Sequence, residues 1–296
     1  MKGFLNTIIS GTMSSATVSP NVEPVVTDDS KIIAKPTSGS TTPSSSMSSR
    51  LDEAQNSSQQ KEEQDLKLAL LDGLIKNHQA SGDHEQALEY HNEKMLLLTD
   101  DEDRVMGLYE EAELHATLGN FEKAIASLNE ALSLQPKSSM LLQGKANLFL
   151  LMGCNNEAIK LYQKLLKLTK DTVERTKVLY TLGRLSHKNG DLKVAIQYYL
   201  EELQITKSSF GKTHLECSRI YHEIARLYEE LCDYRRALVF LEKALKVEKH
   251  NLEGCEGEER IEIKQLIQGT RKYIGRMHYN MGNFQKAMTY IRDQRI

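Results

Sequence analysis

Residues 118–128, LGNFEKAIASL, decide the fold because close variants of this segment recur along the chain. The others are SGDHEQALEY at 81–90, MGCNNEAIKLY at 152–162, NGDLKVAIQYY at 189–199, LCDYRRALVFL at 231–241 and MGNFQKAMTYI at 281–291. The aligned alanines are Ala87, Ala124, Ala158, Ala195, Ala237 and Ala287, separated by 37, 34, 37, 42 and 50 residues. Repetition at this period predicts an array of stacked structural units.

The fourth copy shows why each unit should be a pair of helices. Leu182 and Gly183 belong to an apolar series at helical spacing, which predicts one buried face of a first helix. Gly190 should end that helix, because a left-handed turn is favourable only without a Cβ atom. Asp191 should then cap the second helix, whose inner face includes Ala195. The small residues Gly183 and Ala195 are expected where the two backbones come closest.

The order of residues in the second unit resembles the tetratricopeptide-repeat (TPR) motif. The residues that carry the resemblance are Gly119, Phe121, Ala124, Leu128, Ala131 and Pro136. The resemblance extends over about residues 65–296 and implies an all-α fold, a right-handed α-solenoid of helix-turn-helix units. Two positions depart from the pattern: Glu111 stands where the family has an apolar residue, and Cys232 replaces the glycine between two helices.

The array is expected to occupy residues 61–296 and to contain six TPR units. Their approximate ranges are 68–101, 105–138, 139–172, 176–209, 218–251 and 268–296. The fifth unit has longer spacing and is preceded by Phe210-Gly211-Lys212-Thr213-His214, which is similar to the kinesin light chain type of TPR.

Residues 1–60 have a different composition from the array. They contain four of the five prolines, are rich in serine and threonine, and have Phe4 as their one aromatic residue. Such a segment buries too little apolar area to offset the entropy lost on ordering. We therefore expect a disordered N-terminal tail over residues 1–60.

Charge and cysteine content exclude several classes of function. A formal net charge of −3 argues against general phosphate attraction, so no nucleic-acid partner is expected. No apolar stretch reaches the roughly 20 residues of a membrane span. The four cysteines form no CxxC pair, so neither a disulfide framework nor a metal site is expected. These features favour a cytoplasmic protein.

The sequence contains no motif that predicts catalysis. Gly211-Lys212-Thr213 lacks the earlier glycine of a phosphate-binding loop, since that position is Thr206. Neither HExxH nor GxSxG occurs. We expect a protein that is not an enzyme, with no cofactor and no small-molecule substrate.

The family resemblance implies a binding site in the concave groove, which the first helix of each unit lines. The groove residues expected on this basis are Asn147, Lys177, Tyr180, Arg184, His187, Lys188, Arg219, His222, Arg226, Lys272, Tyr273 and Arg276. Many of them are basic, so the leading hypothesis is an adaptor that binds an acidic peptide or helix of another protein.

Two other hypotheses stay open. The chain could be a structural subunit of a larger assembly, using its convex face and its C-terminal end. There Phe284, Met288 and Ile291 would lack part of their cover, which would permit self-association through the C-terminal repeat. An enzyme of unrecognised chemistry would instead show a deep polar pocket with convergent titratable groups.

Overall fold

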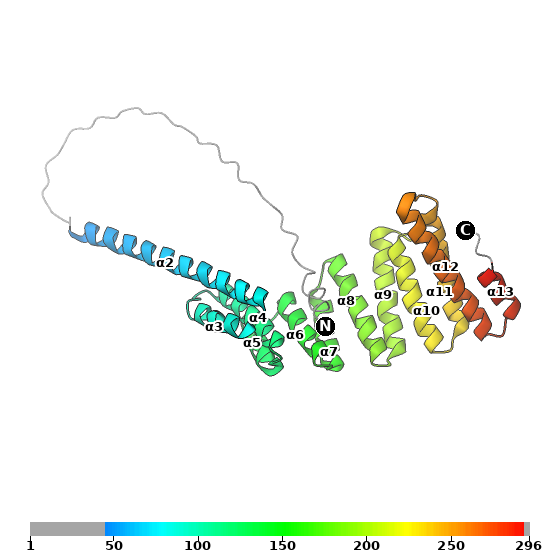
Figure 1. The fold of residues 1–296 in the computed structure, drawn as a ribbon, viewed down its shortest axis with the longest axis horizontal. Helices are drawn as coiled ribbons and strands as arrows, with labels where there is room; N and C mark the ends of the chain where they lie inside the picture. Colours follow the sequence, from blue (N-terminus) through cyan, green and yellow to red (C-terminus); the bar gives the residue numbers. More distant parts are fainter. Residues whose placement is uncertain (1–44, 293–296) are drawn as a thin grey trace, which may run out of the picture. The chain divides into compact units, whose positions relative to one another are not determined.

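The computed structural model describes the backbone of residues 45–292 and the side chains of residues 59–292. This part contains helices and no strand (Figure 1). The helices are α2 (Ser45–Ser81), α3 (His84–Met95), α4 (Asp101–Thr117), α5 (Phe121–Leu134), α6 (Ser139–Leu151), α7 (Asn155–Leu168), α8 (Thr172–Lys188), α9 (Leu192–Phe210), α10 (Leu215–Glu230), α11 (Tyr234–Leu252), α12 (Gly257–Asn280) and α13 (Phe284–Arg292). The predicted all-α solenoid is confirmed.

The start of α2 differs from the prediction of a disordered tail. The chain divides into units at residues 1–56 and 57–296, and α2 begins at Ser45 within the first of them. Residues 45–60 are therefore helical. The physical reason is that no glycine or proline occurs between Pro43 and Gly73, so nothing in that stretch stops a helix. The remainder of the predicted tail, residues 1–44, lies outside the described residues.

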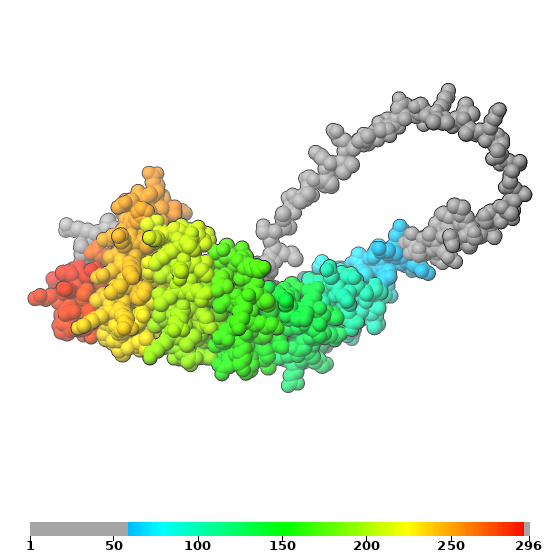
Figure 2. Space-filling view, turned by 180° about the vertical axis from the view of Figure 1, so that it is seen from behind, coloured from blue at the N-terminus to red at the C-terminus, as the bar shows by residue number. Residues whose placement is uncertain are grey.

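From α4 onward the helices pack as pairs, with the second helix of one pair against the first helix of the next. The pairs are α4 with α5, α6 with α7, α8 with α9, α10 with α11, and α12 with α13, and α12 also packs extensively against α11. Since each unit contacts mainly its neighbours in the chain, the units form successive bands in Figure 2. We call α4, α6, α8, α10 and α12 the first helices.

The fourth pair shows how small residues allow this packing. Leu182 on α8 and Ala195 on α9 are fully buried, as the sequence predicted. Gly183 lies against the ring of Tyr199, where an added Cβ would come within 2.7 Å of the ring atom Cε1. Tyr199 is itself fully buried in the cluster that joins α9 to α10. The close approach at Gly183 therefore positions α8.

The turns between paired helices confirm the prediction at Gly190, which has a φ of +84°. Cys232 takes the equivalent place in the fifth unit with a φ of 57°, a region that suits glycine better. Asp191 occupies the N-cap position of α9, but its side chain does not accept the predicted cap hydrogen bond. Instead the Leu192 backbone N–H donates to the Gly190 carbonyl. Asp233 does cap α11, accepting from the Arg236 backbone N–H at 3.1 Å.

Replacing Cys232 with glycine should stabilise the array by about 1 kcal/mol, because a Cβ in the left-handed region costs about 1–2 kcal/mol. Cys232 is exposed, so little packing is lost. Urea denaturation measures the gain. Cys154→Gly is the matched control: Cys154 has a φ of −81°, and glycine there should only add flexibility to the unfolded chain. Equal effects of both substitutions would contradict the prediction.

Candidate functional site

The first helices carry exposed side chains at equivalent positions, and the clearest series is on α8. Lys177, Thr181, Arg184 and Lys188 are spaced by four, three and four residues, so they lie on one face of the helix. We call them the α8 stripe. Its three cations are exposed, and within residues 59–292 none of them forms an ion pair. Arg184 lies over the ring of Tyr180, with 5.7 Å between the guanidinium carbon and the ring centroid.

The equivalent residues of the neighbouring helix α6 are uncharged. They are Met140, Gly144, Asn147 and Leu151, which we call the α6 stripe. Met140 and Leu151 are 39% and 49% exposed, which is high for apolar side chains and gives this surface an apolar character. Asn147, a predicted groove residue, accepts a hydrogen bond from the Tyr162 hydroxyl at 2.8 Å. The amide is therefore engaged within its own helix pair.

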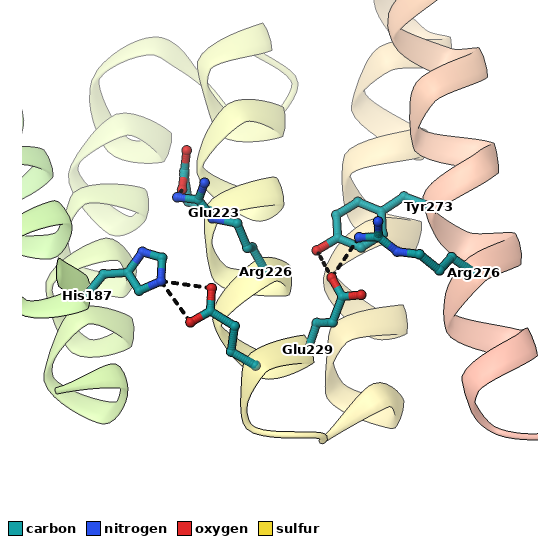
Figure 3. Close-up of polar contacts among 7 residues, drawn as sticks. His187, Glu223, Arg226, Glu229, Tyr273 and Arg276 are labelled. Atoms are coloured by element: carbon teal, nitrogen blue, oxygen red, sulfur yellow. Dashed lines mark hydrogen bonds and ion pairs between the residues drawn. The ribbon is translucent and has the colours of Figure 1, made fainter. Parts of the chain in front are cut away.

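On α10 the equivalent residues alternate in charge: Arg219, Glu223, Arg226 and Glu230. Arg226 forms an ion pair with Glu223 on the same helix (Figure 3). Glu230 accepts from His187 Nε2 of α8 at 2.8 Å. Two predicted groove residues, Arg226 and His187, thus have carboxylate partners inside the array, and the α10 stripe is close to neutral.

Arg219 is at the centre of a contact among three helices. Its guanidinium pairs with the buried Glu202 of α9 and lies over the ring of Tyr180 of α8, with 4.4 Å between the guanidinium carbon and the ring centroid. It also pairs with Glu216 at 2.5 Å. Burial raises the pKa of Glu202 to about 7, although the positive charge of Arg219 acts to lower it. The arginine therefore offsets the cost of burying a carboxylate and holds α8, α9 and α10 together.

The predicted residues of α12 are engaged in the same way. The Glu229 carboxylate of α10 accepts from the Tyr273 hydroxyl at 2.7 Å and from Arg276 at 2.8 Å (Figure 3). Arg276 also lies over the Tyr273 ring at 4.4 Å. Lys272 is exposed and forms no ion pair with any residue that the structure describes. Glu229 thus links adjacent units across the first-helix surface.

His222 belongs to a buried network rather than to the open surface. Its Nε2 lies 3.0 Å from Glu248 Oε1 of α11 and 3.0 Å from Thr270 Oγ1 of α12. Ser218 also donates to Glu248 Oε1, at 2.5 Å, and Glu248 is fully buried. The ring of His222 stacks on Tyr273. Three helices therefore meet at this carboxylate.

The structure thus divides the twelve predicted residues into two groups. In the first group, seven residues form hydrogen bonds or ion pairs within or between units, and Tyr180 lies against the guanidinium of Arg219. The seven are Asn147, His187, Arg219, His222, Arg226, Tyr273 and Arg276. The unpaired positive charge in the predicted groove is confined to the three cations of the α8 stripe and to Lys272. This surface is less basic than the sequence suggested, because Glu223, Glu229 and Glu230 share it.

The repeat pattern of the sequence indicates that two of these glutamates lie in the predicted groove. Glu229 and Glu230 follow Arg226 by three and four residues, as His187 and Lys188 follow Arg184. Aligning the repeats would therefore have placed them in the groove.

Within residues 45–292 no helix is both long enough and apolar enough to cross a membrane.

Comparison with known proteins agrees with the geometry of the helix pairs. Tetratricopeptide-repeat family models match residues 105–138 and 174–249. No match was found among curated proteins. A tetratricopeptide repeat protein from Parabacteroides merdae is similar in structure, with a TM-score of 0.50, 18% identity, and coverage of 77% of this chain and 78% of that chain.

A kinesin light chain-like TPR protein from Podosopora anserina has a TM-score of 0.49 and 19% identity, and the match covers 62% of this chain and 96% of that chain. The matched repeats, the paired helices and the glycine turns lead to one conclusion. Residues 105–138 and 174–249 consist of tetratricopeptide repeats, which support a general role in protein–protein interaction.

Proposed function

We propose that this chain is an adaptor that binds an acidic segment of another protein along the α8 stripe. The observation that carries the proposal is that Lys177, Arg184 and Lys188 are exposed, lie on one helix face and lack carboxylate partners among the described residues. On α10, by contrast, the arginines already have glutamate partners. A ligand's carboxylates would therefore meet unpaired cations on α8 and existing ion pairs on α10.

The energies of exposed ion pairs indicate what kind of binding to expect. An exposed ion pair contributes about 0.2–1 kcal/mol, so three pairs alone give weak and salt-sensitive binding. Because helix α8 is already ordered, its backbone loses little conformational entropy on binding. This favours a ligand that runs along the stripe and makes all three contacts at once. The uncharged α6 stripe beside it, with exposed Met140 and Leu151, adds apolar area for the same ligand.

The test is the binding of fluorescein-labelled octaglutamate to the full chain, measured by fluorescence anisotropy at low salt. Charge reversal of the α8 stripe, Lys177→Glu with Arg184→Glu and Lys188→Glu, should weaken binding about a hundredfold, because attraction becomes repulsion at three contacts.

The matched control reverses three exposed lysines on the second helix α7: Lys160→Glu, Lys164→Glu and Lys167→Glu. Both variants change the net charge of the chain equally. A difference in binding between them therefore reports where the charges lie and not the overall charge. We expect the α7 variant to bind nearly as well as the unaltered chain. Equal losses in the two variants, or no loss in either, would refute the α8 site.

A second candidate function, that of a structural subunit, has one observation in its favour. Large side chains at the C-terminal pair are exposed: Tyr279 at 61%, Phe284 at 58%, Ile291 at 45% and Met288 at 42%. Sedimentation of the chain alone separates the two candidates, because an adaptor should be a monomer and a self-associating subunit should not. The absence of nucleic-acid and membrane partners, and the cytoplasmic location, stay predictions from sequence.

A further inference from the structure

A cleft of about 490 Å³ lies among α3, α4 and α5, away from the α8 stripe. It is lined by Leu88, Asn92, Glu111, His115, Lys123, Ala126, Ser127 and Glu130. Two second helices, α3 and α5, provide most of this lining. The α4 residues equivalent to the α8 stripe are Met106, Glu110, Glu113 and Thr117, and none of these four lines the cleft.

The cleft arises where the second unit departs from the repeat pattern. Glu111 occupies the position that Leu182, Ile224 and Ile274 hold in the fourth, fifth and sixth units. Those three side chains are fully buried. Glu111 is 23% exposed, so its carboxylate stays near solvent and does not fill the equivalent space. A polar hollow replaces an apolar contact.

The Glu111 carboxylate has no hydrogen-bond donor among the residues that the structure describes. His115 lies nearby, with 3.8 Å between Glu111 Oε1 and the ring atom Nε2. His115 is 6% exposed, and its Nδ1 is buried without a hydrogen-bond partner. Burial lowers the pKa of His115, so the ring is neutral at pH 7. The cleft therefore holds an anion that the neighbouring histidine does not neutralise.

The rest of the lining adds acceptors and an apolar wall. The Ser127 hydroxyl donates to the Lys123 carbonyl at 3.1 Å, which leaves the lone pairs of its oxygen free to accept. Glu130 accepts from Arg104 at 2.8 Å through Oε1. Leu88 offers apolar contact for an alkyl stem. Lys123 is an exposed cation of the lining, and its charge adds to the lowering of the His115 pKa.

We propose that this cleft receives an arginine side chain of a partner protein, with its guanidinium on the Glu111 carboxylate. A guanidinium presents a planar fork of donors that matches a carboxylate through two parallel hydrogen bonds. Its other donors can reach the Asn92 amide oxygen and the Ser127 hydroxyl, and its methylenes can lie along Leu88. This site is independent of the α8 stripe, whose ligand is acidic, so either proposal can fail without the other.

The test is a titration of the full chain with N-acetyl-arginine amide, followed through the His115 ring resonances of chain labelled at histidine. We expect a saturable shift with millimolar affinity, and a weaker effect from N-acetyl-lysine amide because an ammonium lacks the fork. Glu111→Gln keeps the shape and removes the charge, and should weaken binding about tenfold.

Two further variants separate binding from folding. Glu111→Leu introduces the kind of apolar residue that the fourth, fifth and sixth units have at this position, so the chain should be at least as stable as before while arginine binding is lost. Glu122→Gln changes an exposed charge on α5 outside the cleft and should bind as the unaltered chain does. Undiminished binding by Glu111→Gln, no shift in the unaltered chain, or an equal response to N-acetyl-aspartate amide would each overturn the proposal.

Discussion

Replacing Gly183 with valine is expected to destabilise the array by more than about 3 kcal/mol, which is at the upper end for overpacking of a core. An added Cβ would come within 2.7 Å of Tyr199 Cε1 and 2.8 Å of its Cζ. Tyr199 cannot turn aside, because its side chain is fully buried among α8, α9 and α10. Valine adds two methyl groups to this clash, so α8 must move away from α9. Urea denaturation followed by circular dichroism measures the loss.

Gly269→Ala is the matched control. Gly269 also lies in a first helix, α12, and a Cβ there would meet nothing within 4 Å. Alanine should therefore be neutral or stabilise the helix by up to about 1 kcal/mol. A second check is Tyr199→Leu in the Gly183→Val background. Removal of the ring should restore part of the lost free energy of unfolding. Equal stability of Gly183→Val and the unaltered chain would mean that the ring does not constrain α8.

The helix pairs could be predicted because the residues that specify them are local. Gly190 and Ala195 lie five residues apart, and their roles follow from backbone conformation and helical spacing alone. Local periodicity is enough for features that lie within one helix pair.

The partners of the groove residues could not be predicted in this way. Arg219 pairs with Glu202, and His222 meets Glu248 from a helix further along the chain. Helical spacing says which side chains share a face, but not which charges of adjacent helices meet. The expected basic groove therefore included arginines that the array itself neutralises. The unpaired cations that remain in the predicted groove are Lys272 and the three of the α8 stripe.

Glu248→Ala is expected to cost about 3 kcal/mol, because it removes the acceptor shared by three side chains and leaves the buried Ser218 hydroxyl without it. Ser218, His222 and Thr270 all lie within 3.0 Å of the one oxygen Glu248 Oε1. Glu248 is fully buried, so water cannot readily replace the lost carboxylate. The loss should also loosen α10 from α12, since Thr270 and His222 meet at this point. Urea denaturation measures the change, and hydrogen exchange of α12 reports the loosening.

Two substitutions serve as controls for Glu248→Ala. Glu242→Ala removes an exposed carboxylate from the same helix, α11, and should change stability by less than about 0.5 kcal/mol. Glu248→Gln keeps one acceptor oxygen at nearly the same place and should retain much of the stability, which a purely electrostatic role would not allow. If Glu248→Ala were as mild as Glu242→Ala, the network would contribute little to the packing of the fifth and sixth units. His222 would then be free to act as the ligand-binding residue that the sequence suggested.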